Sequence, residues 1–211
     1  ISLLPIVLYT GALALESLFR VSEVFGVDKT TSLWVIVWGV GILGSIYAIF
    51  GGLKAVAVSD TINGVGLLVG GIMVTVLGLA YVGDGNAWTG LKEVYHANPE
   101  HFNSVGSSDS VVPFSTLFTG LIVSNMFFWC TNQSIIQRAL GAKNLKEGQK
   151  GVLLCAFLKL LGPLLIILPG IIALHIFQGK LDIPDQAYPD LVQLVLPDAL
   201  VGFFAAVVVG A

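Results

Sequence analysis

Six long apolar stretches constrain the fold of this chain more than any other feature. They cover residues of about 1–19, 32–50, 60–82, 112–137, 151–177 and 198–211. The first five are long enough to cross the hydrocarbon core of a bilayer, and the sixth begins another span. Lipid offers the backbone no hydrogen-bond partner, and the stretches are too long and uniform for barrel strands. The sequence therefore predicts an all-α membrane protein, with residues 1–211 forming a single transmembrane domain.

Charge is scarce along the chain, which is typical of a protein that lies in lipid. Only 11% of the residues are charged and 55% are hydrophobic, whereas a soluble domain carries about 25% charged residues. The net charge is −3 and no basic tract occurs, so we expect the lipid bilayer, and not nucleic acid, as a partner. Apolar sequence is present at residue 1 and again at residue 211. We therefore expect a piece of a longer transporter or channel, with helices missing from the chain.

The loops between the apolar stretches sort by charge and predict an orientation. Alternate loops lie on opposite sides of the bilayer, and one side has five lysines and arginines, of which Arg138, Lys143, Lys146 and Lys150 share one short loop. The other side has four, spread over longer loops with ten acids. Basic residues in short loops stay on the cytoplasmic side. The 138–150 loop is therefore predicted to be cytoplasmic, in a multi-pass protein of the plasma membrane.

Lys159 and Asn125 lie deep inside apolar stretches and are the first candidates for function. A charge at a helix centre in lipid costs at least about 2.5–3.5 kcal/mol. Lys159 lies about 12 Å into its helix from one side, and Asn125 about 20 Å into its helix from the other, so both reach the middle of a core about 30 Å thick. Secondary transporters bind substrate at that depth, which favours a shared cavity. The structural alternative is an asparagine bonded to a neighbouring helix and a lysine with a dedicated partner.

An aromatic face accompanies the asparagine. Asn125, Phe128, Trp129 and Asn132 are spaced i, i+3, i+4 and i+7, so a continuous helix places them on one face. An amide next to aromatic rings suits a sugar, whose hydroxyls take hydrogen bonds and whose C–H face lies against a ring. The alternative is ordinary core packing of the aromatic side chains.

Two acids lie close to predicted helix ends. Asp60 begins the 60–82 stretch, where it either satisfies the free amides of the helix N-terminus or acts as a cation-binding carboxylate at the inner mouth. Glu16 precedes Arg20 by four residues, so we expect an ion pair at the outer helix end.

Two further features of the apolar stretches concern helix geometry. Gly66 and Gly70 form a GxxxG pair, which predicts close packing against another helix. Pro163 and Pro169 interrupt the 151–177 stretch and are expected to bend it.

Four short runs of the sequence resemble those of a known family. The runs GGLKAVAVSD, WCTNQSIIQRALGAKN, AFLKLLGP and LPGIIA are similar to those of the sodium/solute symporter family, and in particular of its sodium/glucose and galactose branch. The resemblance covers essentially the whole chain. It implies a LeuT-type core of ten helices in two inverted five-helix repeats, of which the six stretches match core helices three to seven and the beginning of eight.

The same resemblance implies roles for individual residues. Asn125 and Lys159 are expected to hydrogen-bond the sugar, and Phe128 takes the position of an inner-gate aromatic, commonly tyrosine, so it keeps the stacking face without the hydroxyl. Asp60 matches an acid linked to cation passage, and Ala211 a position whose backbone carbonyl helps to bind sodium. Sodium is then a co-transported ion and not a tightly held cofactor. The rest of both sites is expected on helices outside the chain.

The favoured function is sodium-coupled sugar import by alternating access, and other functions stay open. The same scaffold carries other polyols or acids, such as inositol or sialic acid. A channel subunit is expected to line its pore with repeated polar residues along one helix face, whereas the polar residues here are isolated. A membrane enzyme is expected to carry an acid–base or metal cluster, and the sequence has none.

Overall fold

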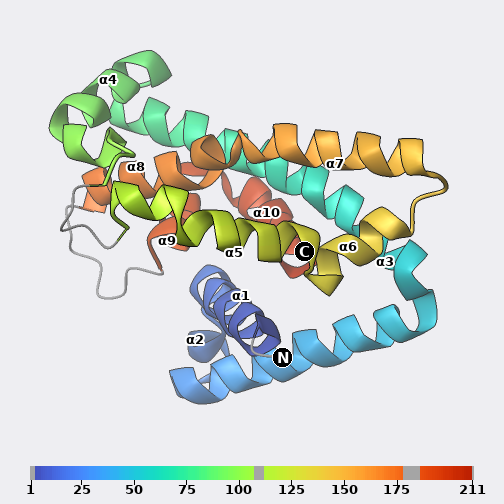
Figure 1. The fold of residues 1–211 in the computed structure, drawn as a ribbon. Helices are drawn as coiled ribbons and strands as arrows, with labels where there is room; N and C mark the ends of the chain where they lie inside the picture. The colour runs from blue at the N-terminus through green and yellow to red at the C-terminus, as the bar shows by residue number, and fades with distance from the viewer. Residues whose placement is uncertain (1–2, 107–111, 178–185, 211) are drawn as a thin grey trace. The chain divides into compact units, whose positions relative to one another are not determined.

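The computed structural model describes residues 3–106, 112–177 and 186–210, which form helices and no strand (Figure 1). The chain divides into two compact units. The larger unit consists of Ile1–Ala97 and Pro163–Ala211, and the smaller unit of Asn98–Gly162. The helices of the larger unit are α1 (Leu3–Phe19), α2 (Val21–Phe25), α3 (Lys29–Val82), α4 (Ala87–Ala97), the π-helical turn η3 (Pro163–Ile167), α8 (Leu168–Phe177), α9 (Ala187–Val195) and α10 (Asp198–Gly210). Those of the smaller unit are η1 (Pro99–Phe102), η2 (Phe114–Phe118), α5 (Gly120–Cys130), α6 (Gln133–Leu140) and α7 (Leu145–Lys159).

Helix α3 contains two of the predicted stretches in one element. At 1.5 Å per residue its 54 residues measure about 80 Å, far more than the hydrocarbon thickness of about 30 Å. The helix is divided by a bend at Gly52, whose φ of 60° and ψ of −170° are open to glycine and costly for other residues. The bend is visible in Figure 1 between the blue and cyan parts of α3. The interval expected between the 32–50 and 60–82 stretches is therefore a break at one residue, and the helix resumes directly after it.

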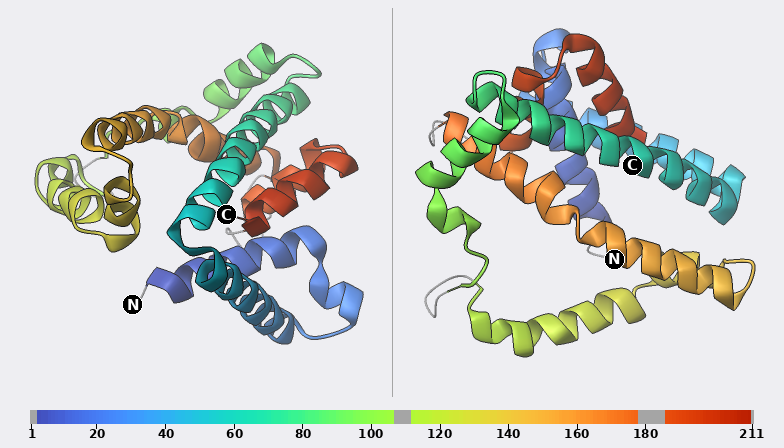
Figure 2. Two further views of the ribbon diagram at one scale, coloured as in Figure 1. Left: turned by 90° about the vertical axis from the view of Figure 1, so that its right-hand side faces the viewer. Right: turned by 90° about the horizontal axis from the view of Figure 1, so that it is seen from above.

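The core of the larger unit lies along the second half of α3. Gly66 and Gly70 are buried, and a Cβ at either position would lie 2.7 Å from α10, against the side chain of Val207 or the ring of Phe204. Figure 2 shows α10 beside this half of α3. The predicted GxxxG packing is confirmed, and its partner is α10.

The predicted outer loops contain helices. Helix α4 folds back on the end of α3 so closely that a Cβ at Gly90 would lie 1.9 Å from the carbonyl oxygen of Leu79. Helix α9 buries Leu191 and Val192, and its Gln193 Nε2 donates to the Ser17 carbonyl at 2.6 Å. The sequence prediction treated both segments as loops because they lie between the apolar stretches, over 83–111 and 178–197.

In the smaller unit the predicted 112–137 helix is broken. Its beginning is the 3₁₀ turn η2, and α5 ends at Cys130. The hydroxyl of Thr131 donates to the Phe127 carbonyl at 2.7 Å, and its amide donates to the same carbonyl at 3.0 Å. The amide bond is the usual i to i−4 bond of an α-helix, and α5 ends with it. The Asn132 carbonyl then accepts from the amides of Ile135 and Ile136, which begins α6.

The predicted 151–177 helix is broken as well, as its prolines indicated. Helix α7 ends at Lys159, and the π-helical turn η3 begins at Pro163. At the other end α7 begins earlier than expected, because Asn144 accepts a hydrogen bond from the Glu147 amide at 2.9 Å and caps the helix. The basic loop predicted over 138–150 is therefore mostly helical, with a turn over 141–144.

The ion pair predicted between Glu16 and Arg20 is wrong. Glu16 is buried, and its carboxylate accepts hydrogen bonds from the Ser22 amide at 3.1 Å and from the Ser32 hydroxyl. Arg20 has a left-handed backbone conformation and lies 3.8 Å from Glu23. The helix ends before Arg20, so the two side chains do not share a helical face.

Among the described residues, one helix, Lys29–Val82, is long and apolar enough to cross a membrane. A second candidate arises if Leu145–Lys159 and Pro163–Phe177 are counted together as one broken span. Shorter apolar helices are Pro5–Phe19, Gly120–Cys130 and Ala199–Val208. The number of five full spans stays a prediction.

Candidate functional site

Lys159 and Trp129 meet in the smaller unit. Lys159 is the last residue of α7 and Trp129 the penultimate residue of α5. The Lys159 Nζ lies 4.4 Å from the centroid of the Trp129 ring, within the range of a cation–π interaction, which is worth about 0.5–2 kcal/mol depending on desolvation. The partner of Lys159 in the structure is thus an aromatic ring. The contact leaves the ammonium hydrogens available for another acceptor.

Phe128 extends the aromatic surface. Its ring packs edge-to-face on Trp129, with 5.4 Å between the centroids and 83° between the planes, which is a favourable geometry for two aromatic rings. Phe128 is 42% exposed and Trp129 is half-buried. The pair therefore presents ring surface outward and is not enclosed as a core would be.

Asn125 lies one helical turn before Trp129 on the same face of α5. Its Nδ2 donates to the Leu121 carbonyl in its own helix at 2.8 Å, which fixes the amide and uses one of its two N–H donors. The side chain is exposed. Asn125, Phe128 and Trp129 therefore lie on one face of α5, and Lys159 of α7 contacts Trp129. Their role as a binding site stays a prediction.

Asn132 does not belong to this face. The i+7 position exists only on a continuous helix, and α5 ends at Cys130, two residues earlier. The depth assigned to Asn125 also assumed a continuous helix from residue 112. Asn125 is instead the sixth residue of α5, which follows a 3₁₀ turn with a rise of about 2.0 Å per residue. Its depth in the bilayer stays a prediction.

Asp60 lies in the larger unit, away from any helix end. It follows the Gly52 break by eight residues, more than two turns, so its carboxylate is too far from the first free amides to cap them. The capping interpretation of Asp60 is therefore wrong. Its neighbours Ser59 and Asn63 bond to each other, with the amide nitrogen 3.4 Å from the hydroxyl oxygen.

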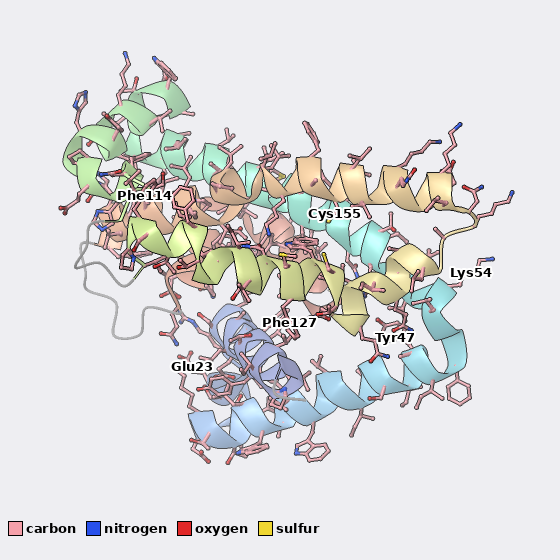
Figure 3. The ribbon with its side chains drawn as sticks, in the orientation of Figure 1. Glu23, Tyr47, Lys54, Phe114, Phe127 and Cys155 are labelled. Atoms are coloured by element: carbon pink, nitrogen blue, oxygen red, sulfur yellow. The ribbon has the colours of Figure 1, made fainter. Side chains whose placement is uncertain are left out.

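A shallow groove of about 520 Å³ follows the bend of α3. Its lining consists of Gly51, directly before the break, and of Lys54, Ala55, Val58, Ser59 and Ile62, which lie on one face of the helix after it. Figure 3 shows Lys54 at this bend. A groove with walls from a single helix does not enclose a solute. In the parts of the chain that the structure describes, no group of three or more His, Cys, Asp or Glu side chains is arranged to hold a metal ion.

Ala211, the predicted sodium ligand, lies outside the described residues. Helix α10 extends to Gly210 directly before it. The role of the Ala211 carbonyl therefore stays a prediction.

Sequence analysis missed the polar contact between α3 and η3. Thr75 is 3% exposed, and its hydroxyl lies 2.9 Å from the Leu164 carbonyl of η3. The signal in the sequence was a threonine between Gly71 and Gly78 at helical spacing, which marks a small-residue face with a single hydroxyl.

These features together define a class of protein. Apolar helices that break beside a lysine, an amide and aromatic rings are typical of secondary transporters, which tolerate irregular backbone where it lines a binding cavity. The comparison with known families agrees. The model of the sodium:solute symporter family matches residues 6–211, and the chain belongs to that family. It is therefore part of a helical membrane transporter and not of an enzyme.

Several curated proteins are similar to the chain. The uncharacterized symporter YidK of Escherichia coli (strain K12) is 50% identical over 210 residues, which cover 99% of this chain and 36% of that protein. The sodium/glucose cotransporter of Vibrio parahaemolyticus is 35% identical, over 79% of this chain and 30% of that protein. The sodium/myo-inositol cotransporter 2 of Rattus norvegicus is 28% identical, over 100% and 34%. The chain thus spans about a third of the length of these relatives.

Proposed function

We propose that this chain is part of a sodium-coupled sugar symporter that works by alternating access, with the sugar held near the membrane midplane. The observation that carries the proposal is the meeting of Lys159 with Trp129 at 4.4 Å, one turn from Asn125. Three chemistries that a sugar needs are then close together: a charged donor, an amide and aromatic ring faces. In the proposed architecture the six apolar stretches are core helices three to seven and the beginning of eight of a LeuT-type fold.

Each site residue has a distinct role in this proposal. The Lys159 ammonium donates to a sugar hydroxyl while the ring of Trp129 stabilises its charge. Asn125 offers its carbonyl oxygen and a second N–H to neighbouring hydroxyls. Phe128 supplies a ring face below the sugar and, lacking a hydroxyl, does so without a gate hydrogen bond. The missing walls of the site come from other helices of the transporter.

The proposed sodium path involves the larger unit. Asp60 attracts the cation on its passage, and the Ala211 carbonyl contributes one ligand to the sodium site. Sodium and sugar stabilise a common conformation, so each raises the affinity for the other by the same factor. In the proposed topology the protein is a multi-pass protein of the plasma membrane and the turn at 141–144 is cytoplasmic.

The test uses the full-length transporter in proteoliposomes with an inward sodium gradient. D-glucose, D-galactose and myo-inositol are the probes, and at least one is expected to accumulate only with sodium. Lys159→Ala and Asn125→Ala are each expected to weaken binding of that probe by about 1–3 kcal/mol, since each leaves a hydrogen bond of the sugar unmade. Lys92→Ala is the matched control, because Lys92 also lies over a tryptophan, at 5.6 Å from the Trp88 centroid, but on α4. Unchanged binding in both site variants contradicts the site.

Asp60→Asn tests the cation role separately. The variant is expected to change the sodium concentration for half-maximal uptake or to admit another cation, with normal protein levels. Because Asp60 does not cap a helix, the loss of a cap does not account for a change in sodium dependence in this variant. Identical sodium dependence in the variant and the parent excludes Asp60 from the cation path.

Myo-inositol is the second candidate substrate. It is favoured by the several relatives whose names include sodium/myo-inositol cotransport, and it offers the same ring of hydroxyls to Lys159 and Asn125. The three-probe experiment distinguishes the candidates: accumulation of myo-inositol alone assigns the site to a cyclic polyol.

A further inference from the structure

Helix α4 of the larger unit has two different sides. Gly90 and Val94 are buried. Trp88, Lys92 and Tyr95 are spaced i, i+4 and i+7 and share the opposite side of the helix. Trp88 is 65% exposed and Tyr95 is 50% exposed, and the Lys92 Nζ lies 5.6 Å from the centroid of the Trp88 ring. We call Trp88, Lys92 and Tyr95 the aromatic–basic face of α4.

Helix α4 is held against the end of α3, as Figures 1 and 2 show. The Asn86 Oδ1 accepts a hydrogen bond from the Trp88 amide at 2.9 Å, which fixes the start of α4. A Cβ at Gly90 would lie 1.9 Å from the Leu79 carbonyl oxygen, so no side chain separates the two helices there. The aromatic–basic face therefore has a fixed position relative to the last turns of α3.

The end of α3 is the end of a predicted membrane span. The stretch 60–82 measures about 35 Å at 1.5 Å per residue, slightly more than a hydrocarbon core of about 30 Å. Tyr81 in the last turn of α3 is 55% exposed, and the polar residues Asp84 and Asn86 follow it. Tryptophan and tyrosine are enriched at the level of the lipid headgroups, where a ring with a polar end is suited to both surroundings. Tyr81, Trp88 and Tyr95 are three such residues at one end of the predicted span.

We propose that the aromatic–basic face of α4 binds phospholipid headgroups at the surface of the bilayer. The Trp88 indole N–H and the Lys92 ammonium are donors for phosphate oxygens, and the rings of Trp88 and Tyr95 lie against the glycerol and the upper acyl carbons. The positive charge of Lys92 favours anionic headgroups. The contact holds the end of α3 at a constant level in the membrane. It goes beyond the proposed sugar and sodium sites and includes none of their residues.

Photocrosslinking in the full-length transporter tests this contact. Tyr95 is replaced by p-benzoyl-phenylalanine, which keeps an aromatic side chain and reacts with neighbouring C–H bonds on illumination. The protein is reconstituted in nanodiscs of equal parts phosphatidylcholine and phosphatidylglycerol, and the adducts are identified by mass spectrometry. A phospholipid adduct is expected at residue 95. The matched control carries the same photoreactive residue at Glu93, which is exposed on a different side of α4, and at least several-fold less lipid adduct is expected there.

Lys92→Ala tests the contribution of the charge. In the background with the photoreactive residue at position 95, it is expected to lower the ratio of phosphatidylglycerol to phosphatidylcholine among the adducts roughly fivefold. Sugar binding is expected to stay at the level of the parent, because Lys92 lies outside the proposed sugar site. The lipid contact and the proposed function therefore fail independently. An unchanged lipid ratio would show that Lys92 does not face the headgroups.

Two outcomes at residue 95 overturn the proposal. Crosslinks to another part of the transporter would show that protein, and not lipid, covers this face. Equal lipid adducts at residues 93 and 95 would show that α4 has no specific lipid-facing side. Should the variant at residue 95 not accumulate, the photoreactive residue at Trp88 takes its place, and the absence of a lipid adduct there overturns the proposal as well.

Discussion

The two compact units differ in how they are stabilised. The larger unit has a core in which α3 packs on α10, α4 and α8 through buried glycines and residues such as Val74, Ile172 and Leu191. In the smaller unit, Asn98–Gly162, none of the side chains that the structure describes is buried. Its aromatic and aliphatic residues are exposed, including Phe127 at 66% and Leu153 at 71%. In a family of membrane transporters such surfaces are covered by lipid or by further helices.

The candidate residues follow this division. Asn125, Phe128, Trp129 and Lys159 all belong to the smaller unit, whereas Asp60 and the end of α10 belong to the larger one. Regions with few buried contacts are the ones that open and move most easily. The proposed sugar contacts therefore lie on the less packed part of the chain, and the proposed cation contacts lie on the more packed part. Substitutions in the two units are therefore expected to have different consequences.

The largest expected effect is an all-or-none difference in labelling across the smaller unit. Cys130 and Cys155 are both free and exposed, so they are first replaced by serine in the full-length protein. Single cysteines are then placed at Lys146 and Glu100. An impermeant maleimide is expected to label Lys146→Cys from the cytoplasmic side alone and Glu100→Cys from the outside alone. Labelling of both from the same side would mean that the unit does not cross the bilayer.

A substitution in the larger unit is expected to cost more stability than any in the smaller one. Gly90→Ala places a Cβ 1.9 Å from the Leu79 carbonyl oxygen, and neither backbone can move without separating α4 from α3. The expected loss in free energy of unfolding is about 1–3 kcal/mol or more, measured as a fall in the melting temperature of the detergent-solubilised transporter.

The control for this variant is Gly64→Ala on α3, the helix on which α4 packs. A Cβ at Gly64 meets nothing within 4 Å, and alanine is favoured over glycine in a helix by about 1 kcal/mol, so no loss is expected. Equal melting temperatures for Gly90→Ala and the parent would contradict the packing of α4 on α3.

The sequence predicts the helices and one close helix contact, but it predicts only some of the helix breaks. Apolar length predicted the helices, and the Gly66–Gly70 spacing predicted a close helix contact, because both depend on local composition. Pro163 predicted the break between α7 and α8, because proline cannot continue a helix. The break at Thr131 has no proline or glycine to mark it, and hydrophobic periodicity alone does not reveal it.

The candidate site shows the same limit. Helical spacing placed Asn125, Phe128 and Trp129 on one face, and that face exists because all three lie within α5. The prediction from helical spacing is wrong for Asn132, which lies beyond the end of α5. The contact of Lys159 with Trp129 joins residues 30 positions apart in the sequence. Contacts of this kind follow from how helices pack, and sequence spacing does not encode them.

A moderate effect on binding, without one on stability, is expected at Trp129. Trp129→Ala removes the cation–π partner of Lys159, so the sugar probe is expected to bind about tenfold more weakly. Trp129→Phe keeps a ring with a weaker quadrupole and is expected to lose less. Because the smaller unit buries no described side chain, the melting temperature is expected to change little. A large fall in melting temperature with unchanged binding would reverse the comparison and make Trp129 a packing residue.

The smallest expected effect lies at the N-terminal end of α3 in the larger unit. Asp28 caps this helix: its carboxylate accepts from the Thr31 amide at 3.0 Å and from the Thr31 hydroxyl at 2.6 Å. These hydrogen bonds to the charged form lower the pKa of Asp28 below its ordinary value. A lowered pKa in the folded state means that the stabilisation is fully present above the ordinary pKa of about 3.9 and is lost as the pH falls through the lower, folded-state value. Asp28→Asn keeps an accepting oxygen and removes the charge, so it is expected to cap the helix with a stability that no longer depends on this titration. The two proteins are compared by their melting temperatures between pH 7 and strongly acidic pH. The gap between them is expected to be small at pH 7 and to close in acid, and a gap that widens in acid would show that Asp28 does not cap α3.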